Sequence, residues 1–329
     1  MTDARFGVGI VGCGLIGQKR AKALGPARLV ACADLIPERA QALAAVTSAT
    51  AISDWRSLVG RDDVDIIIVA TTNDALAEVS AAAIKAGKHV LVEKPAALNV
   101  RELRTVMEAA QRAQVQVRVG FNHRYHPALR KARWLWEKGL LGEMMLVRGR
   151  YGHGGRIGYD KEWRANPLVS GGGELIDQGV HLIDLARWFL GDFSEVQGFA
   201  HTYYWKMPVD DNGFMLLKTA TKQVAFLHVS CTEWKNLFSL EIYGKNAKLH
   251  VEGLGGSYGL ERLTYYRMLP EMGPPETTIW EYPMADISWQ LEFAEFLDDL
   301  RTGREPSANL NDAYAALNIV ESIYQDSGI

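Results

Sequence analysis

The sequence has 329 residues, of which 48% are hydrophobic, and a formal net charge of -3 at neutral pH. This length predicts two domains with a substantial core, and the small, mixed charge argues against nucleic acid or an anionic membrane surface as a partner. The chain enters a strand almost at once and has no apolar run near membrane-spanning length, so we expect a cytoplasmic protein without a membrane anchor. Its cysteines, Cys13, Cys32 and Cys231, are not spaced as a CxxC pair, which argues against a disulfide framework and a metal site.

The first predicted elements are a strand over residues 6–11 and a helix that closes at Gly25, joined by a glycine-rich loop. In this loop Gly12, Gly14 and Gly17 fit the pattern G-x-G-x-x-G. Such glycines permit a tight turn, close approach of the backbone to a pyrophosphate, and close packing of the helix on the strand. The pattern favours dinucleotide binding, although ordinary glycine-rich turns can show it too.

The second predicted strand, residues 28–33, ends at Asp34. An acidic residue about 20 positions after the first glycine can accept both ribose hydroxyls of an adenosine. This favours NAD over NADP, because Asp34 would repel a 2′-phosphate and Leu35 supplies no cation. Arg39 in the following helix could stack on adenine, or it could be an ordinary solvated helix charge.

Strands and helices continue to alternate with short connections, which predicts a doubly wound parallel sheet whose ligand crevice lies at the carboxyl ends of the strands. Lys94 follows the strand at residues 89–92, so we expect it to face that crevice rather than to be a surface lysine at a turn. The other predicted elements of this part are strands at residues 65–70 and 115–121 and helices at residues 74–86 and 99–113.

After residue 122 the pattern changes to alternating β-rich runs, which predict an α+β domain with an open, mostly antiparallel sheet. We therefore expect a dinucleotide-binding domain over residues 1–122 and a substrate-binding and oligomerisation domain over residues 123–329. The predicted strands are residues 144–151, 195–204, 214–219, 223–232, 238–243, 247–252 and 263–266, and helices return at residues 288–300 and 312–324.

A helix beginning near Leu175 is apolar on both sides of a polar line formed by Asp177, His181 and Asp184. A buried carboxylate beside a buried imidazole is costly unless the two satisfy each other or face a ligand. The pattern therefore indicates either a satisfied core pair or an acid–base site.

Together these pieces resemble the Gfo/Idh/MocA family of NAD(P)-dependent sugar and cyclitol oxidoreductases, over nearly the whole chain. The resemblance implies a Rossmann domain, an open-sheet domain and an active site between them. It also implies that Lys94, Asp177 and His181 lie at the reacting carbon. The Lys94-Pro95 bond is often cis in similar proteins. The chain departs from many relatives at Thr72 and Leu76, where they carry proline and histidine. The motifs are Gly12-x-Gly14-x-x-Gly17, Glu93-Lys94-Pro95, Gly120-Phe121-Asn122 with Arg124, Trp163-Arg164, and Gly171-Gly172-Gly173 before Asp177, His181 and Asp184.

We predict hydride transfer between NAD and a ring secondary alcohol of a sugar, a sugar derivative or a cyclitol. His181 would act as the base, Asp177 would orient it or bind a substrate hydroxyl, and Lys94 would hold the reacting oxygen. An imidazole, with an unperturbed pKa of ~6.5, suits this role, but a relay through Lys94 stays open. The same scaffold also resembles an NAD-dependent glycosidase and a non-catalytic NAD-responsive regulator.

Two further sets of residues complete the predicted site. Cofactor binding is assigned to Gly12, Gly14, Leu15, Ile16, Gly17, Asp34, Arg39, Thr71, Thr72, Asn73, Glu93 and Lys94. Substrate binding is assigned to Asn122, Arg124, Tyr151, His153, Trp163 and Arg164, although either arginine could instead tie domains together.

Large aromatic side chains on the second domain indicate a further contact, either with the substrate or with a second subunit. The run Tyr203-Tyr204-Trp205 could pack on a sugar face or cover a subunit contact. An open sheet face with large aromatics invites burial by a second copy, so we expect a homodimer or homotetramer through that face.

Overall fold

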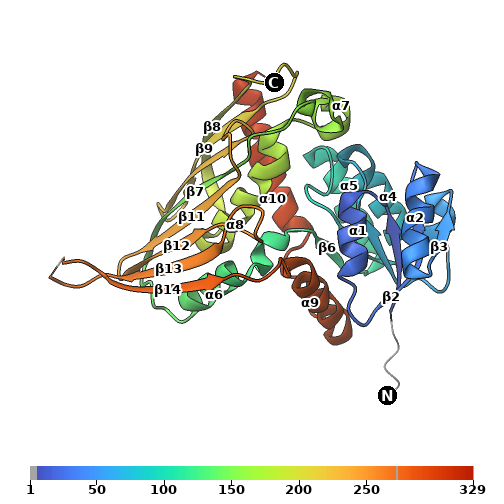
Figure 1. The fold of residues 1–329 in the computed structure, drawn as a ribbon, viewed down its shortest axis with the longest axis horizontal. Helices are drawn as coiled ribbons and strands as arrows, with labels where there is room; N and C mark the ends of the chain where they lie inside the picture. The colour runs from blue at the N-terminus through green and yellow to red at the C-terminus, as the bar shows by residue number, and fades with distance from the viewer. Residues whose placement is uncertain (1–5, 272, 329) are drawn as a thin grey trace. The chain divides into compact units, whose positions relative to one another are not determined.

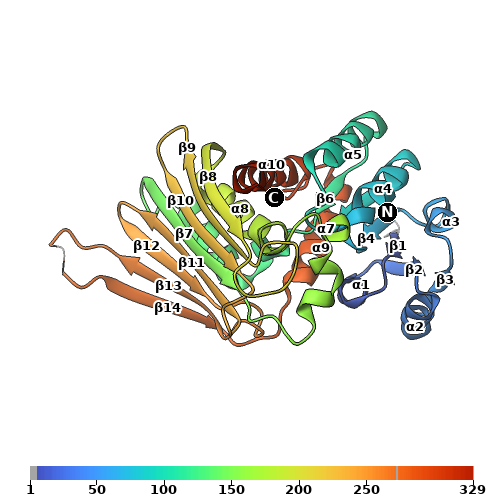
Figure 2. The same ribbon diagram turned by 90° about the horizontal axis from the view of Figure 1, so that it is seen from above.

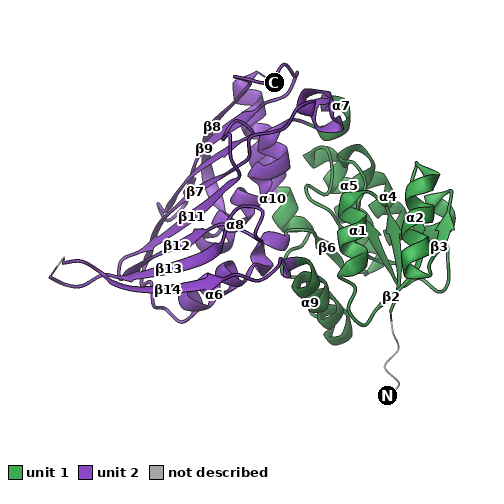
Figure 3. Cartoon of the chain, viewed as in Figure 1, with its two compact units in different colours: residues 1–121, 168–171, 289–314 green, residues 122–167, 172–288, 315–329 purple. Residues whose placement is uncertain are grey.

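The computed structural model describes residues 6–271 and 273–328, and these fall into two compact units (Figures 1 and 3). Unit 1 runs to residue 121 and includes residues 168–171 and 289–314. Unit 2 comprises residues 122–167, residues 172–288 and the chain from residue 315 onward.

Unit 1 contains a six-stranded sheet in the order β3-β2-β1-β4-β5-β6, in which every neighbouring pair is parallel. Its central strands read as unbroken apolar runs because helices cover both faces, with α4 and α5 on one side and α1 and α2 on the other (Figure 2). The predicted doubly wound sheet is therefore confirmed. The strands are β1 (Gly7–Val11), β2 (Arg28–Ala33), β3 (Thr50–Ile52), β4 (Ile66–Val69), β5 (His89–Val92) and β6 (Val117–Val119).

The helices of unit 1 connect these strands, except for one that comes from far along the chain. That helix is α9 (Ser288–Thr302), whose Phe293 and Phe296 pack in one core cluster with Val8 and Ile10 of β1. The two-range domain division placed this segment in the C-terminal domain, and the structure corrects it, because an apolar helix face does not reveal which sheet it covers. The other helices are α1 (Leu15–Lys22), α2 (Pro37–Thr47), α3 (Trp55–Val59), α4 (Asn73–Lys85) and α5 (Val100–Ala113).

Unit 2 contains an eight-stranded sheet in the order β14-β13-β12-β11-β7-β10-β9-β8. All neighbouring pairs are antiparallel except β7 with β10, which confirms the expectation of a mostly antiparallel sheet. The strands are β7 (Met144–Gly152), β8 (Phe193–His201), β9 (Asn212–Thr219), β10 (Val224–Ser230), β11 (Leu237–Gly244), β12 (Ala247–Glu252), β13 (Glu261–Arg267) and β14 (Glu276–Tyr282).

One face of this sheet is covered by α6 (Pro127–Glu137), α8 (Val180–Leu190) and the C-terminal part of α10 (Leu310–Ser327), of which Figure 2 labels α8 and α10. In the described part of the chain no helix lies on the other face, which we call the open face. Its register places Phe199, Leu216 and Phe226 on β8, β9 and β10, and these side chains are 70%, 46% and 51% exposed.

The sequence misplaced two parts of this sheet. Strand β8 ends at His201, because the backbone N–H groups of Tyr203, Tyr204 and Trp205 turn to the carboxylate of Asp211. The aromatic run therefore lies in a loop, not on the open face. Strand β14 was missed because its exposed edge position lets polar residues replace the apolar alternation.

Short non-α turns separate the helices of unit 2. Three are 3₁₀ helices, at η1 (Asn122–Tyr125), η2 (Tyr159–Lys161) and η3 (Trp163–Ala165), and one is a π-helical turn, η4 (Leu175–Gly179), directly before α8. A four-residue helix, α7 (Pro167–Ser170), completes the elements. Among the helices of residues 6–271 and 273–328, none combines the length and the apolar character needed to span a bilayer.

Candidate active site

The glycine-rich loop of unit 1 connects β1 to α1, and its glycines meet different surroundings. A Cβ on Gly12, whose φ is +94°, would lie 2.3 Å from the carbonyl oxygen of Ala70, and a Cβ on Gly17 would lie 1.9 Å from that of Gly12. A Cβ on Gly14 would have no heavy atom within 4 Å apart from those of Gly14 and its two chain neighbours. The loop is thus tightly packed at Gly12 and Gly17 and open at Gly14. This arrangement fits a pyrophosphate that binds against the backbone of the loop.

Asp34 lies directly after β2, and backbone donors hold its carboxylate. One oxygen accepts a hydrogen bond from Cys13 N at 2.7 Å and the other from Ile36 N at 2.8 Å. Each carboxylate oxygen has a second lone pair, so Asp34 can still accept from a ribose diol. The neighbouring Leu35 is 93% exposed and uncharged, and Arg39 is exposed on α2.

The other predicted cofactor residues of unit 1 differ in exposure. Leu15 is 71% exposed at the start of α1, and Ile16 is half-buried. Thr71 and Thr72 are half-buried before α4, where Thr72 is the N-cap residue. The buried amide of Asn73 donates to the carbonyl of Ser170 at 2.8 Å, so this side chain has a packing role within unit 1.

Glu93 and Lys94 follow β5 and have unlike environments. Lys94 is half-buried, and its peptide bond to Pro95 is cis, as the resemblance implied. Glu93 is buried and accepts from Arg20 Nε at 2.6 Å, while Arg20 also pairs with Glu292. Burial raises the pKa of Glu292 despite that partner. Arg20 was not predicted, because in sequence it is one more cation on the surface of α1.

In unit 2 the helix that carries the predicted catalytic residues is interrupted by η4. Asp177 lies in this π-helical turn and His181 in the first turn of α8, so the expected single α-helical stripe is corrected. A π turn widens the backbone and is found frequently at functional sites. The helix N-terminus is held by Asp210, whose carboxylate accepts from Gly173 N and Leu175 N at 2.8 and 2.7 Å.

The three polar residues of this helix have three different neighbours. The ring of His181 stacks on that of His123, with centroids 3.8 Å apart and an interplanar angle of 22°. The carboxylate of Asp177 accepts from Arg164 Nε at 2.9 Å. Asp184 is buried and is bound in a bidentate ion pair by Arg124, whose Nε donates to it at 2.8 Å.

This arrangement separates the two arginines that the sequence grouped together. Arg124 is 5% exposed and its guanidinium is committed to Asp184 inside unit 2, which matches a packing role. Arg164 is 31% exposed and holds the partly exposed Asp177 while stacking on Trp163. Asn122, between β6 and α6, donates to Ser288 Oγ at 2.9 Å.

A second polar cluster of unit 2 surrounds the buried carboxylate of Glu174. His153 Nε2 lies 3.5 Å from it and Tyr159 Oη donates to it at 3.3 Å. Gly155 N donates to His153 Nδ1 at 2.9 Å, so Nε2 carries the hydrogen of the neutral ring. Burial lowers the pKa of His153 and raises that of the buried Tyr151.

The predicted residues thus form two groups. All cofactor residues and Lys94 belong to unit 1, and Asp177, His181 and all substrate residues belong to unit 2. The sequence missed His123, Glu174, Tyr159 and Arg20. A signal existed only for the first two, which lie inside motifs already quoted.

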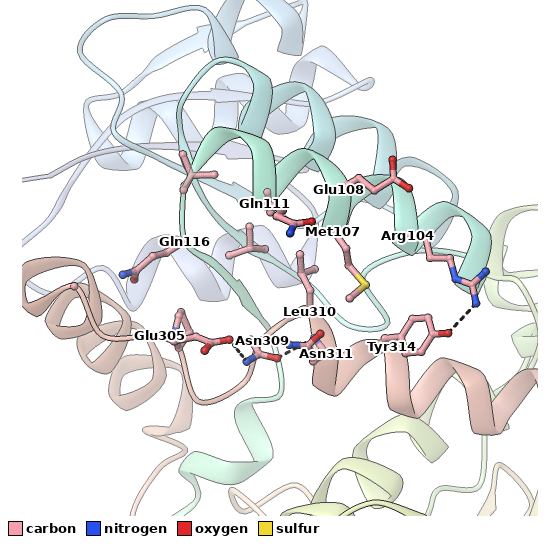
Figure 4. Close-up of a pocket in the computed structure, with 15 residues that line it drawn as sticks. Arg104, Met107, Glu108, Gln111, Gln116, Glu305, Asn309, Leu310, Asn311 and Tyr314 are labelled. Atoms are coloured by element: carbon pink, nitrogen blue, oxygen red, sulfur yellow. Dashed lines mark hydrogen bonds between the residues drawn. The ribbon is translucent and has the colours of Figure 1, made fainter.

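Unit 1 also contains an open groove of about 810 Å³ between α5 and residues 303–314 (Figure 4). Arg104 donates to Tyr314 Oη at 2.8 Å and Asn309 donates to Glu305 at 2.7 Å. No predicted site residue is among the residues that line it.

The parallel sheet with its open glycine loop and oriented Asp34 defines a dinucleotide-binding protein, and the Asp177/His181 helix supplies acid–base groups. Comparison with family models gives the same class. Residues 6–121 match the oxidoreductase family with an NAD-binding Rossmann fold, and residues 129–250 match the GFO/IDH/MocA C-terminal domain. The chain belongs to the GFO/IDH/MocA family of oxidoreductases, and its cofactor is NAD.

Named relatives fall into two groups of dehydrogenases. Levoglucosan dehydrogenase of Pseudarthrobacter phenanthrenivorans is 30% identical over 64% of this chain and 58% of its own length. Inositol 2-dehydrogenase of Acidothermus cellulolyticus is 29% identical over 96% of this chain and 90% of its own length. A solved structure of levoglucosan dehydrogenase with NADH and levoglucosan has a TM-score of 0.87 at 24% identity, covers 98% of each chain, and supports the fold.

Proposed function

We propose that this enzyme transfers a hydride between NAD and a ring secondary alcohol of a sugar or a cyclitol. The observation that carries the proposal is His181 at the start of α8, with Asp177 held by Arg164 in the preceding π turn, in a chain of an NAD-binding oxidoreductase family. Relatives named for levoglucosan and for inositol both act on rings that bear secondary alcohols, which supports this substrate class.

The residues of unit 1 are assigned to binding NAD, which when bound supplies the hydride acceptor. The open backbone at Gly14 would take the pyrophosphate, and the carboxylate of Asp34 would take the ribose hydroxyls. Asp34 carries a negative charge and Leu35 none, so we propose NAD rather than NADP as the preferred dinucleotide.

The residues of unit 2 are assigned to the proton. His181 takes the hydroxyl proton of the substrate, because a neutral imidazole can serve as a base at neutral pH. Asp177, fixed by Arg164, binds a substrate hydroxyl or orients the base. We assign Lys94 to the reacting oxygen, where a cation stabilises negative charge as it develops. His153, Tyr151 and Trp163 are proposed to contact the substrate ring.

The substrate class is tested by incubating the purified enzyme with NAD and inositols, anhydrosugars, free hexoses, sugar phosphates and nucleotide sugars. We expect net NADH to accumulate with at least one class, as its absorbance band reports. Release of a sugar without net NADH would instead identify a glycosidase, and NAD binding with no turnover on any class would contradict the proposed reaction.

The base assignment is tested by His181→Ala. Loss of a general base lowers turnover by about 10²- to 10⁴-fold, so we expect that loss in kcat with unchanged NAD binding measured by calorimetry. His201→Ala, an exposed histidine of the same unit on β8, serves as the matched control and should keep its activity. Normal turnover in the His181 variant would remove the assignment.

We also propose that two or more copies associate through the open face, since Phe199, Leu216 and Phe226 form an exposed apolar cluster on adjacent strands. Free, buried cysteines support a reducing compartment, and we therefore place the enzyme in the cytoplasm.

A further inference from the structure

His123 is a buried histidine that the proposed reaction does not use. It lies in η1, directly after the last strand of unit 1, and its ring stacks on that of His181 at 3.8 Å. The two residues are only 6% and 5% exposed. One face of the ring of the proposed base is therefore covered by a second imidazole, not by an aliphatic or a carbocyclic aromatic side chain.

Aromatic rings enclose this stack. Tyr151 of β7 meets His123 edge-on at 5.2 Å and His181 at 6.4 Å, and Phe238 of β11 lies 6.1 Å from His123 and 5.5 Å from Tyr151. Edge-to-face contacts of this kind stabilise ring pairs. The enclosure restricts rotation of both imidazoles and keeps water from separating them.

The hydrogen-bond partner of His123 determines which nitrogen carries its hydrogen. Nδ1 of His123 lies 3.3 Å from Oδ1 of Asn122, and a carbonyl oxygen can only accept. The amide of Asn122 is oriented by its donation to Ser288 Oγ. In the neutral ring Nδ1 is therefore the protonated nitrogen.

The short stacking distance limits the charge that the two rings can hold. Two like charges 3.8 Å apart repel strongly in a buried site, so one proton on the stack opposes a second. A neutral aromatic face beside a cation is instead favourable. The two imidazoles should therefore titrate as one coupled pair.

Charged and titratable groups on the surrounding elements have partners of their own. On the catalytic helix and beside it these are Asp177 with Arg164, Glu174 with His153, and Asp184 with Arg124. From the other elements they are His126 with Glu261, and the phenols of Tyr151 and Tyr258, whose pKa values are raised by burial.

We propose that His123 is a positioning residue that acts through His181. The two stacked imidazoles accept one proton between them, and the neutral ring of His123 keeps the ring of His181 in place when His181 becomes charged. The inference rests on the proposed role of His181 as the base. It adds a partner from η1, outside the catalytic helix.

Proton counting by NMR tests the pairing without any substrate. The imidazole signals of the full-length protein are followed between about pH 9 and about pH 5 in the unmodified protein, His123→Phe and His181→Phe. In the unmodified protein we expect the two rings to bind one proton between them, so that the NMR signals of both show a partial shift at a common midpoint. In each variant the signals of the remaining histidine should show a full shift. Two full and independent titrations in the unmodified protein would overturn the proposal.

Kinetics then test positioning. His123→Phe keeps a ring in the stack and should retain kcat within about fivefold, whereas His123→Ala removes the ring and should lower kcat at least tenfold with an unchanged Kd for NAD. Equal loss in both variants, or no loss in His123→Ala, would refute positioning. If His181→Ala is fully active while the rings share one proton, the base assignment fails and the pairing stands.

Discussion

Gly14 and Gly17 belong to one motif, yet the structure gives them different reasons to be glycine. Gly17 is required by packing, since a Cβ would lie 1.9 Å from the carbonyl oxygen of Gly12. Gly14 has open space beside it, since a Cβ there would have no heavy atom of the described chain within 4 Å apart from those of Gly14 and its two chain neighbours. Packing inside the described chain therefore does not require glycine at position 14, which is the position that we assign to the pyrophosphate of NAD.

The pair Gly14→Ala and Gly17→Ala separates ligand binding from folding. Gly14→Ala should leave the melting temperature unchanged and weaken NAD binding about tenfold or more, because the methyl group occupies the place of the pyrophosphate. Gly17→Ala should lower the free energy of unfolding by about 1–3 kcal/mol, since the helix must move away from the loop. Calorimetric titration with NAD and thermal melts measure the two effects, and unchanged NAD affinity in Gly14→Ala would contradict the assignment.

At the scale of elements, the π turn before α8 depends on Asp210. This residue is fully buried, and its oxygens accept from Gly173 N, Leu175 N and Tyr324 Oη, the last at 2.7 Å. Burial raises the pKa of Asp210 although all three donors oppose the shift. The residue thus connects the loop before β9 to η4 and to α10.

Asp210→Asn should therefore destabilise unit 2, because the amide NH₂ of asparagine would face a backbone N–H group and cannot accept a hydrogen bond from it. An unsatisfied buried donor costs about 2 kcal/mol. Tyr324→Phe removes the hydroxyl that donates to Asp210 and accepts from Gly173 N, but Gly173 N keeps its bond to Asp210, so this variant should cost about 1 kcal/mol. Urea unfolding measures both. Equal stability of Asp210→Asn and the unmodified protein would show that the turn does not need the carboxylate.

The open face has a charged half, in which Glu241 of β11 contacts Arg148 of β7 and Lys248 of β12. Burial alone would raise the pKa of Glu241, but the hydrogen bonds from these two cations outweigh it and lower the pKa from 4.5 to about 2. A carboxylate with a lowered pKa in the folded state stabilises the fold above its unfolded pKa. That contribution is lost as the pH falls from 4.5 toward about 2.

Glu241→Gln should consequently lower the free energy of unfolding at neutral pH by about 1 kcal/mol. The difference from the unmodified protein should shrink below pH 4.5 and be largely lost as the pH approaches about 2, where the folded carboxylate is itself being protonated. Denaturant unfolding across this range measures it. Glu276→Gln, in an exposed ion pair with Arg267, is the control and should change little. A difference that does not depend on pH would refute the electrostatic explanation.

At the scale of the whole molecule, the open face is assigned to a second copy of the chain. Phe226→Glu places a charge in the apolar cluster, and burying an unpaired charge is costly, so the oligomer should dissociate. Light scattering should report a dimer or tetramer for the unmodified protein and a monomer for this variant. Val46→Glu on α2, 81% exposed and outside the cluster, should not change the mass. A monomeric unmodified protein, or an oligomeric Phe226 variant, would contradict the assignment.

Much of the fold follows from local sequence, because short-range patterns report short-range structure. The alternation of apolar runs with capped helices predicted the parallel sheet, and the glycine motif with Asp34 predicted the dinucleotide side of the site. Helical spacing also placed Asp177 and His181 one turn apart. Each of these features depends on residues close together in the chain.

Contacts between distant segments decided the rest. The stacking of His123 on His181, the burial of Arg20 between Glu93 and Glu292, and the packing of α9 against the first sheet join residues far apart in sequence. The hydrophobic periodicity of one segment does not reveal which distant segment it packs against. The sequence by itself predicted most of the elements and the residues that we assign to the chemistry, and only the tertiary structure decided their partners, because packing depends on which surfaces meet after the chain has folded.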